Sequence, residues 1–371
     1  MSAMFDNRDQ EDGLPADRIV AVPTSRRQLL AGLSASLVGA SCPGIARAAR
    51  PKPLRRYRML LNSGYSGVNS WFVIAQDKGY LRDEGIEIDF TSGRGAYTAA
   101  PRMAAEGFDL GYGDINALIE AAANSATPAK VPVGVYMMFN QSPSVIGVAA
   151  DGPIRTPQDL AGKRIAAHPT DVALGTFPPY ARATGFDPAA ITVVPSDASM
   201  TALVTDMLAG KSDGVFGYFT TQTAAALTAG IDPATRLRFL RYDTVLPDFY
   251  GSAVMASADM VTTHPHDVKR IVRAFNRGVI DAVRDPEAAV AAAMRRDSSL
   301  RREVELSRLT ETLRHEMNHA ERAALGIGDA SDARLSRAIA AMVETKSLPR
   351  TPATRSIFTR AFLPPKNARL S

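Results

Sequence analysis

Two places in the sequence carry residue types and spacings that can do chemistry. Residues 315–319, His-Glu-Met-Asn-His, fit the H-E-x-x-H pattern, which on a helix puts two imidazoles one turn apart with a glutamate that activates zinc-bound water. Asp114 directly follows an apolar run, where its carboxylate can accept hydrogen bonds from a ligand's amino groups or cap the next helix. The two patterns point to different classes of protein, a metal hydrolase and a binding protein.

The surroundings of residues 315–319 favour a solvated helix face over a zinc site. Charged residues crowd this stretch, and Leu325 stands where the extended zinc motif has a third histidine. The sequence shows no pattern of a Ser/His/Asp triad and no G-x-S-x-G turn. We therefore predict a protein that is not an enzyme and uses no cofactor or metal, with a zinc hydrolase through His315 and His319 as the alternative.

Asp114 ends one copy of a layout that occurs twice. In each copy a helix stops at a glycine, an aspartate follows, and a short apolar run ends in a glycine and a polar residue. The glycine supplies a left-handed C-cap, and the run is typical of a buried parallel strand. Because open parallel sheets bind ligands beyond the carboxyl ends of their strands, two such sheets facing each other would bring both ends to one cleft. The copies are 101–106, Gly107, Asp109 and the run to Gly113-Asp114, and 199–209, Gly210, Asp213 and the run to Gly217-Tyr218.

The elements needed to position these ends alternate between strands and helices. Strands are expected at 57–61, 86–90 and 164–167, and the chain is mainly helical from Pro265 onward. This order predicts an α/β fold of two lobes, each a mixed, mostly parallel sheet flanked by helices, joined by two crossover strands that form a hinge. Expected boundaries are lobe 1 at 55–147 plus 252–363, lobe 2 at 148–251, and a loose tail at 364–371.

The first residues form a targeting segment and not part of the fold. Arg26-Arg27 precedes a short, moderately apolar stretch, and Ala46-Arg47-Ala48 has the small-x-small form that a signal peptidase cleaves. We predict a twin-arginine-type signal at 1–48, cleavage near Ala48/Ala49, a linker at 49–54 and a periplasmic location. Cys42 is the only cysteine, and Gly39 does not suit a lipid-attachment site, so the mature chain would contain no cysteine.

The composition excludes a disordered tail, a small disulfide-rich protein and a polytopic membrane protein. Hydrophobic residues make up 46% of the chain and charged residues 22%, as in an ordinary globular protein with room for two domains. The net charge of +5 is spread without a Lys/Arg cluster, which gives no reason to expect nucleic acid as a partner.

Small-residue loops follow the expected strands. Ser63 to Gly67 and Gly93-Arg94-Gly95 are either ordinary strand-to-helix turns or loops that contact a ligand, and no Gly-Lys-Ser/Thr follows them, which disfavours nucleotide hydrolysis. Thr170-Asp171 is an expected N-cap facing the cleft from the second lobe, next to a His168 expected to be structural. Aromatic residues near strand ends either form flat walls suited to a planar heterocycle or, for several of them and for Trp71 in particular, pack in a core. They are Tyr65, Trp71, Tyr97, Tyr112, Tyr136, Phe139, Tyr218, Phe219 and Tyr250.

An ordered series of segments resembles the periplasmic solute-binding proteins of ABC importers, in the branch that includes binders of alkanesulfonates, nitrate and thiamine-pyrimidine precursors. The C-terminal segments are most similar to the thiamine-precursor subfamily. The series comprises Ala75–Ile86, Ala105–Gly111, Asp159–Lys163 and Asp285–Glu287, with Ala341–Glu344 and Ile357–Pro364 at the C-terminal end.

The resemblance implies a type II periplasmic binding fold and a monomer that closes on a small aromatic or heterocyclic, nitrogen- or sulfur-containing solute and delivers it to permease transmembrane subunits. A thiamine pyrimidine precursor is favoured. Relatives of that subfamily hold the pyrimidine with a Trp, an Asn and a His in the first loop, whereas here that loop has no His and Trp71 is displaced. A sensor module for a receptor is a further alternative. Candidate ligand-binding residues are Ser63, Tyr65, Ser66, Asn69, Arg94, Tyr97, Asp114, Asn140, Thr170, Asp171, Tyr218 and Tyr250.

Overall fold

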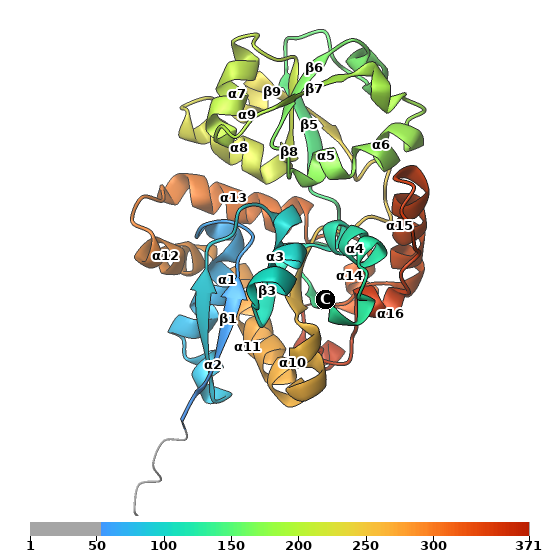
Figure 1. Ribbon diagram of the computed structural model, residues 1–371. Coiled ribbons are helices and arrows are strands. Elements are labelled where there is room, and N and C mark those ends of the chain that lie inside the picture. The colour runs from blue at the N-terminus through green and yellow to red at the C-terminus, as the bar shows by residue number, and fades with distance from the viewer. Residues whose placement is uncertain (1–52, 371) are drawn as a thin grey trace, which may run out of the picture. The chain divides into compact units, whose positions relative to one another are not determined.

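The structure is a computed structural model that describes residues 53–370, and these form two lobes, each built on a five-stranded mixed sheet (Figure 1). The expected signal at 1–48 lies outside the described residues. Within 53–370, no helix combines the length and the apolar character that crossing a membrane requires.

The first sheet has the strand order β2-β1-β3-β10-β4. Strand β1 pairs in parallel with β2 and β3, whereas β10 runs antiparallel to its neighbours β3 and β4. The bounds are β1 (Arg55–Leu60), β2 (Ile86–Thr91), β3 (Leu110–Asp114), β4 (Val133–Met137) and β10 (Ser252–Ala256).

The second sheet repeats this pattern in the order β7-β6-β8-β5-β9. Strand β6 pairs in parallel with β7 and β8, and β5 runs antiparallel to β8 and β9. The predicted two-lobed α/β fold is therefore confirmed. The bounds are β5 (Ser144–Ala149), β6 (Arg164–Ala167), β7 (Thr192–Pro195), β8 (Gly214–Tyr218) and β9 (Leu237–Arg241).

The repeated aspartates play one structural part in both lobes. Asp109 accepts a hydrogen bond from the backbone N–H of Arg58 at 2.7 Å and donates its own N–H to the Arg58 carbonyl at 3.1 Å. Asp213 does the same with Arg164, at 2.8 and 2.7 Å. Each aspartate thus ties the start of β3 or β8 to the neighbouring parallel strand, which explains why the layout recurs.

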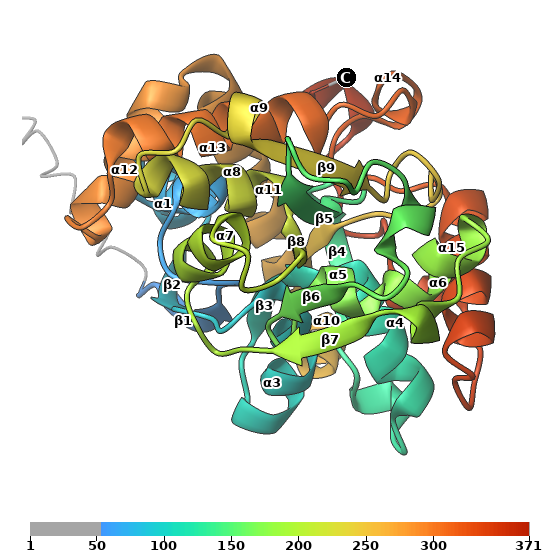
Figure 2. The ribbon, with the colours of Figure 1, turned by 90° about the horizontal axis from the view of Figure 1, so that it is seen from above.

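Helices cover both faces of the first sheet. The pleat sends Tyr112 and Val254 towards α1 and α11, and sends Ala253 and Met255 towards α4 and α15. Helix α15 also extends alongside α6 of the second lobe (Figures 1 and 2). The bounds are α1 (Ser70–Asp77), α2 (Tyr80–Asp83), α3 (Ala99–Glu106), α4 (Ile115–Asn124), α10 (Ala258–Thr263), α11 (Pro265–Arg284), α12 (Pro286–Arg296), α13 (Arg302–His315), α14 (Glu321–Leu325), α15 (Asp332–Thr345) and α16 (Thr354–Ile357).

The second lobe has shorter helices around its sheet. They are α5 (Val172–Gly175), α6 (Phe177–Ala183), α7 (Met200–Leu208), α8 (Phe219–Thr228) and α9 (Pro233–Arg236). Short 3-10 turns complete the chain at Gly67–Asn69, Ala96–Thr98, Pro128–Lys130, Pro157–Leu160, Pro188–Ala190 and Lys366–Ala368.

Two sequence predictions about boundaries are wrong. The expected boundary at 147/148 falls inside β5, which pairs with β8 and β9, so the whole strand belongs to the second lobe. The described part of the expected loose tail, 364–370, is held in place, because the carbonyl of Ala368 accepts a hydrogen bond from Asn276 and that of Leu370 accepts one from the Ile327 N–H. Polar backbone groups paired in this way anchor a terminus that has no periodic pattern.

Two crossovers connect the lobes: residues 138–143 join β4 to β5, and residues 242–251 join β9 to β10. Both contact Arg334 near the start of α15. The buried Arg334 donates to the Asn140 carbonyl at 3.1 Å and to the Pro247 carbonyl at 2.6 Å, one in each crossover. Its guanidinium also pairs with Glu321 at 2.7 Å and lies 4.2 Å above the Tyr250 ring. One side chain therefore joins both connections between the lobes.

Candidate functional site

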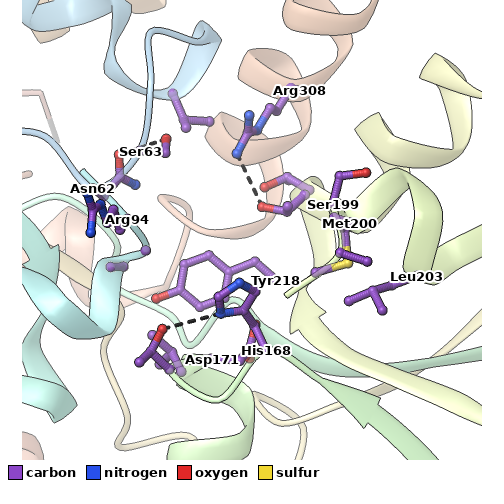
Figure 3. Close-up of a pocket in the computed structure, with 18 of the residues that line it drawn as sticks. Asn62, Ser63, Arg94, His168, Asp171, Ser199, Met200, Leu203, Tyr218 and Arg308 are labelled. Carbon is purple, nitrogen blue, oxygen red and sulfur yellow. Dashed lines mark hydrogen bonds between the residues drawn. The ribbon is translucent and has the colours of Figure 1, made fainter. Parts of the chain in front are cut away.

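A cavity of about 390 Å³ lies where the loops of the two lobes meet (Figure 3). The first lobe contributes loops after β1 and β2, the first crossover and the α13 region, and the second contributes the loops after β6 and β7 and the start of α8. The lining residues are Asn62, Ser63, Val68, Arg94, Gly95, Ala96, Phe139, Arg308 and Glu316 from the first lobe side, and His168, Thr170, Asp171, Val172, Asp197, Ala198, Ser199, Met200, Leu203, Tyr218, Thr220 and Thr221 from the second.

Five of the candidate residues line this cavity. They are Ser63, Arg94, Thr170, Asp171 and Tyr218. All five stand in loops or at a strand end where the chain leaves its sheet, which is the position that the strand-to-helix pattern indicates.

Asp114 lies behind Tyr218 and does not line the cavity. The Tyr218 hydroxyl donates to Asp114 Oδ2 at 2.8 Å, so the ends of β3 and β8 do come together across the lobes. Asp114 Oδ1 accepts the Asn116 N–H at 2.8 Å and caps α4, the structural alternative to ligand binding. Burial raises the pKa of Asp114 to about 6, although the Tyr218 and Asn116 hydrogen bonds oppose the shift.

In the loop after β1, the other candidate side chains contact the loop itself or the core and not the cavity. Asn69 is fully buried, its Oδ1 accepts the Ser66 N–H at 3.0 Å, and its Nδ2 donates to the Gly64 carbonyl at 2.9 Å. Ser66 is buried as well, and Tyr65 packs against the core of the first lobe. These side chains fix the shape of the loop that presents Ser63.

Three further candidates lie outside the cavity wall, near the junction of the lobes. Tyr97 hydrogen-bonds to Glu120, with Gly175 of the second lobe against its ring. Asn140 accepts the His319 N–H at 3.0 Å, and the Tyr250 hydroxyl accepts the Ser331 N–H at 2.8 Å. Their strand-end positions match the pattern, but the side chains turn towards the lobe junction.

The expectation of an aromatic wall is wrong for most of its members. Among the aromatic residues expected there, Phe139 and Tyr218 line the cavity. Trp71 is fully buried and packs edge-on against Tyr112 and Phe139 in the first core, because α1 turns that face onto the sheet. The cavity wall consequently combines two aromatic residues with polar and aliphatic side chains.

The H-E-x-x-H segment does not form one helical face, because α13 ends at His315. His315 Nε2 lies 3.1 Å from Glu311 Oε2, whereas His319 lies beyond the helix and its Nδ1 accepts the Glu321 N–H at 3.1 Å. The expected solvated face is also wrong at Glu316, which is 1% exposed and lines the cavity. Its Oε1 accepts a hydrogen bond from Thr220 at 2.9 Å, and burial raises its pKa to about 7.

Sequence reasoning missed the α13 contribution. Arg308 donates to Thr221 Oγ1 at 3.2 Å across the lobes, and its Nε has no hydrogen-bond partner among residues 53–370. Arg94 makes no hydrogen bond or ion pair within the same residues. Thr220 and Thr221 lie two and three residues after Tyr218, close enough to the end of β8 for their position at the cavity to be predicted from the strand end. Arg308 has no such local signal, since it lies on a helix far along the chain.

The cavity wall thus carries groups of both signs. Arg94 and Arg308 supply donors and positive charge (Figure 3), and Asp171, Asp197 and Glu316 supply acceptors. His168, expected to be structural, lines the wall with its side chain 43% exposed and its Nε2 3.8 Å from Asp197. Asp171 caps α5 through the Ala173 N–H at 2.7 Å, and burial raises its pKa to about 6. This arrangement can bind a small polar molecule through opposite ends.

Two α/β lobes of like topology, joined by two crossovers around a cavity, define the periplasmic binding protein fold. The chain belongs to the NMT1/THI5-like family, whose model matches residues 69–289. A comparison with curated proteins finds no match.

Solved structures of the same fold include binding proteins and an enzyme. The alkanesulfonate-binding protein SsuA from Xanthomonas axonopodis pv. citri, bound to MOPS, is 19% identical over 82% of this chain and 98% of its own, with a TM-score of 0.62. The periplasmic aliphatic sulphonate binding protein SsuA from Escherichia coli is 17% identical over 82% and 92%, with a TM-score of 0.61. A mutant of the desulfurization enzyme DSZB, in complex with biphenyl-2-sulfinic acid, is 15% identical over 84% and 99%, with a TM-score of 0.54. At these identities the likeness establishes the fold.

Proposed function

We propose that this chain is the periplasmic solute-binding component of an ABC importer, which traps a small solute between its lobes and presents it to the permease transmembrane subunits. The observation that carries the proposal is the cavity of about 390 Å³ to which both lobes contribute polar side chains. Closure of such lobes desolvates the solute and creates the two-lobed surface that a permease can distinguish from the open form.

The solute that we propose first is a small nitrogen heterocycle of the thiamine pyrimidine-precursor type. The NMT1/THI5-like family and the paired donors and acceptors of the cavity support it. An alkanesulfonate is the second candidate, because Arg94 and Arg308 bring two guanidinium groups to the cavity and this fold includes sulfonate-binding proteins.

The direct test is to identify what the protein carries and binds. Mass spectrometry of small molecules released on denaturing freshly purified protein should detect the solute, and isothermal titration with 4-amino-5-hydroxymethyl-2-methylpyrimidine and with alkanesulfonates should rank the two classes. Arg308→Gln should weaken binding of the retained solute at least tenfold, since it removes a charged donor from the wall. Arg314→Gln, an exposed arginine on the same helix, is the matched control and should leave binding unchanged.

An enzyme built on the same fold remains the alternative class, as the DSZB structures illustrate. Incubation of the purified chain with each bound solute, followed by mass spectrometry, separates the two. Recovery of the unchanged solute supports transport, and any product formed in proportion to protein contradicts it.

A further inference from the structure

Glu316 occupies an unusual position for a carboxylate. It lies just beyond α13, lines the cavity and is 1% exposed. Its Oε1 accepts a hydrogen bond from Thr220, and Thr312 lies close enough to stabilise the charged carboxylate as well, but no hydrogen bond reaches Oε2 among residues 53–370. A buried polar atom without a hydrogen-bond partner destabilises the folded chain, and a charged atom does so more strongly. A hydrogen-bond donor on a bound solute would remove this destabilisation.

The neighbouring cation, Arg308, does not supply the hydrogen bond that Glu316 Oε2 lacks. Arg308, on α13, lines the same cavity but forms no ion pair with Glu316 within the described residues, and its side-chain hydrogen bond goes to Thr221. Glu316 and Arg308 therefore engage consecutive threonines at the start of α8, and each keeps one polar atom unpaired, Oε2 and Nε. This part of the wall offers an acceptor and a donor at once.

Apolar side chains around the Glu316 carboxylate favour a solute that can donate a hydrogen bond to it over one that cannot. Phe139 and Val68 line the same cavity, and Met317 beside Glu316 is buried in the first core. In such a site a solute group that cannot donate a hydrogen bond leaves Oε2 desolvated and unpaired. Sites that bind a substrate N–H or O–H reject analogues lacking it far more strongly than apolar pockets discriminate by size.

Resting on the proposed function, we infer that Glu316 determines specificity by accepting, at Oε2, a hydrogen bond from an N–H group of the solute. The solute class is therefore small molecules that carry an amino group or a comparable N–H donor. An aminopyrimidine belongs to this class, and so does an aminoalkanesulfonate, whereas a plain alkanesulfonate does not.

Two matched pairs of probes test this inference by isothermal titration. One pair is 2-aminoethanesulfonate and ethanesulfonate, and the other is 4-amino-5-hydroxymethyl-2-methylpyrimidine and its 4-methyl analogue. The proteins are the wild-type chain, Glu316→Gln and the control Glu311→Gln, whose glutamate lies on α13 and outside the cavity lining. We expect the amino member of the pair that binds to be preferred by at least tenfold, and Glu316→Gln to remove most of that preference.

Glu316→Asp provides a second variant should Glu316→Gln fold poorly. It keeps the carboxylate but withdraws it by one methylene, so a direct contact predicts a similar loss of preference. Equal affinity for the two members of a pair, or a preference that survives in both variants, overturns the inference while leaving solute binding established. Binding of none of the four probes by the wild-type chain overturns this solute class, and the proposed function fails only if no bound solute is released on denaturation either.

Discussion

At the scale of single residues, the hydrogen bond between Tyr218 and Asp114 joins the two lobes and can be tested directly by mutation. Asp114 is fully buried, and Tyr218 is the side chain that joins its Oδ2 from the opposite lobe at 2.8 Å. Tyr218→Phe leaves Oδ2 without this donor and should lower the free energy of unfolding by about 1–3 kcal/mol. Urea denaturation measures the change, and a double-mutant cycle with Asp114→Asn should show coupling between the sites.

A cycle with no coupling energy would mean that Tyr218 contributes through its ring alone. The Tyr218 ring remains in the Phe variant, so the comparison isolates the hydroxyl. Asp114→Asn by itself should weaken the α4 cap, because an amide oxygen accepts the Asn116 N–H less strongly than a carboxylate.

Glu316 should make stability depend on pH in a defined direction. Burial raises its pKa from 4.5 to about 7, so the folded chain binds this proton more tightly than the unfolded chain. The contribution to stability is complete below about pH 4.5 and is lost as the pH rises through about 7, with a size on the order of 3 kcal/mol. Urea denaturation of the wild-type chain and Glu316→Gln from pH 5 to 8 measures it.

The difference between the two proteins is the relevant quantity, since Asp114 and Asp171 also have raised pKa values and titrate with the same sign in both. The stability of Glu316→Gln should exceed that of the wild-type chain increasingly towards pH 8. Parallel pH profiles for the two proteins would show that the Glu316 carboxyl is not shifted.

At the scale of elements, the repeated aspartates allow a comparison between lobes. Asp109 and Asp213 each accept one backbone N–H from the neighbouring parallel strand. Asp109→Ala and Asp213→Ala should each lower the free energy of unfolding by about 1 kcal/mol, because one hydrogen bond to a carboxylate is lost in each. The two losses should add in the double variant, since the sites lie in different sheets and share no partner.

Thermal or urea unfolding of the two single variants and the double variant checks this expectation. Asp187→Ala, an aspartate that caps the short turn Pro188–Ala190 away from both sheets, is a control for removing a capping carboxylate from the surface. A non-additive double variant would mean that the sheets unfold as one coupled unit through these sites.

At the scale of the whole described chain, Arg334 sets how the lobes are connected. Its Nη2 donates to one carbonyl in each crossover while its Nη1 pairs with Glu321, and a lysine ammonium, with a single nitrogen, cannot occupy both positions. Arg334→Lys keeps the charge beside Glu321 and should lower the free energy of unfolding by about 1–3 kcal/mol. We also expect small-angle scattering to report a larger radius of gyration, because the crossovers are no longer held together.

Arg314→Lys is the matched control. Arg314 is exposed on α13 and pairs with Glu311 outside both crossovers, so its replacement should change stability by less than about 0.5 kcal/mol and leave the scattering curve unchanged. Equal effects of the two substitutions would assign the Arg334 result to general loss of arginine and not to the hinge.

Features that depend on neighbouring residues follow from the amino-acid sequence alone. Gly107 ends α3 in the left-handed conformation, Asp171 caps α5, and the aspartates of the repeat stand where each buried strand begins. These are local hydrogen-bonding and steric requirements, which appear as residue types at short spacing. From them followed the alternation of strands and helices, the two lobes and the position of the loops that line the cavity.

Which side chains enter the cavity depends on how distant segments of the chain pack against one another. Glu316 reaches it because α13, which follows the second crossover, packs against α8, and Thr220 is 96 positions earlier in the chain. Side-chain direction settled the rest: Asn69, Tyr97 and Tyr250 stand in suitable loops yet turn to brace the loop or the lobe junction. Contacts between distant segments depend on how helices dock on sheets, and a pattern of neighbouring residues does not encode that packing.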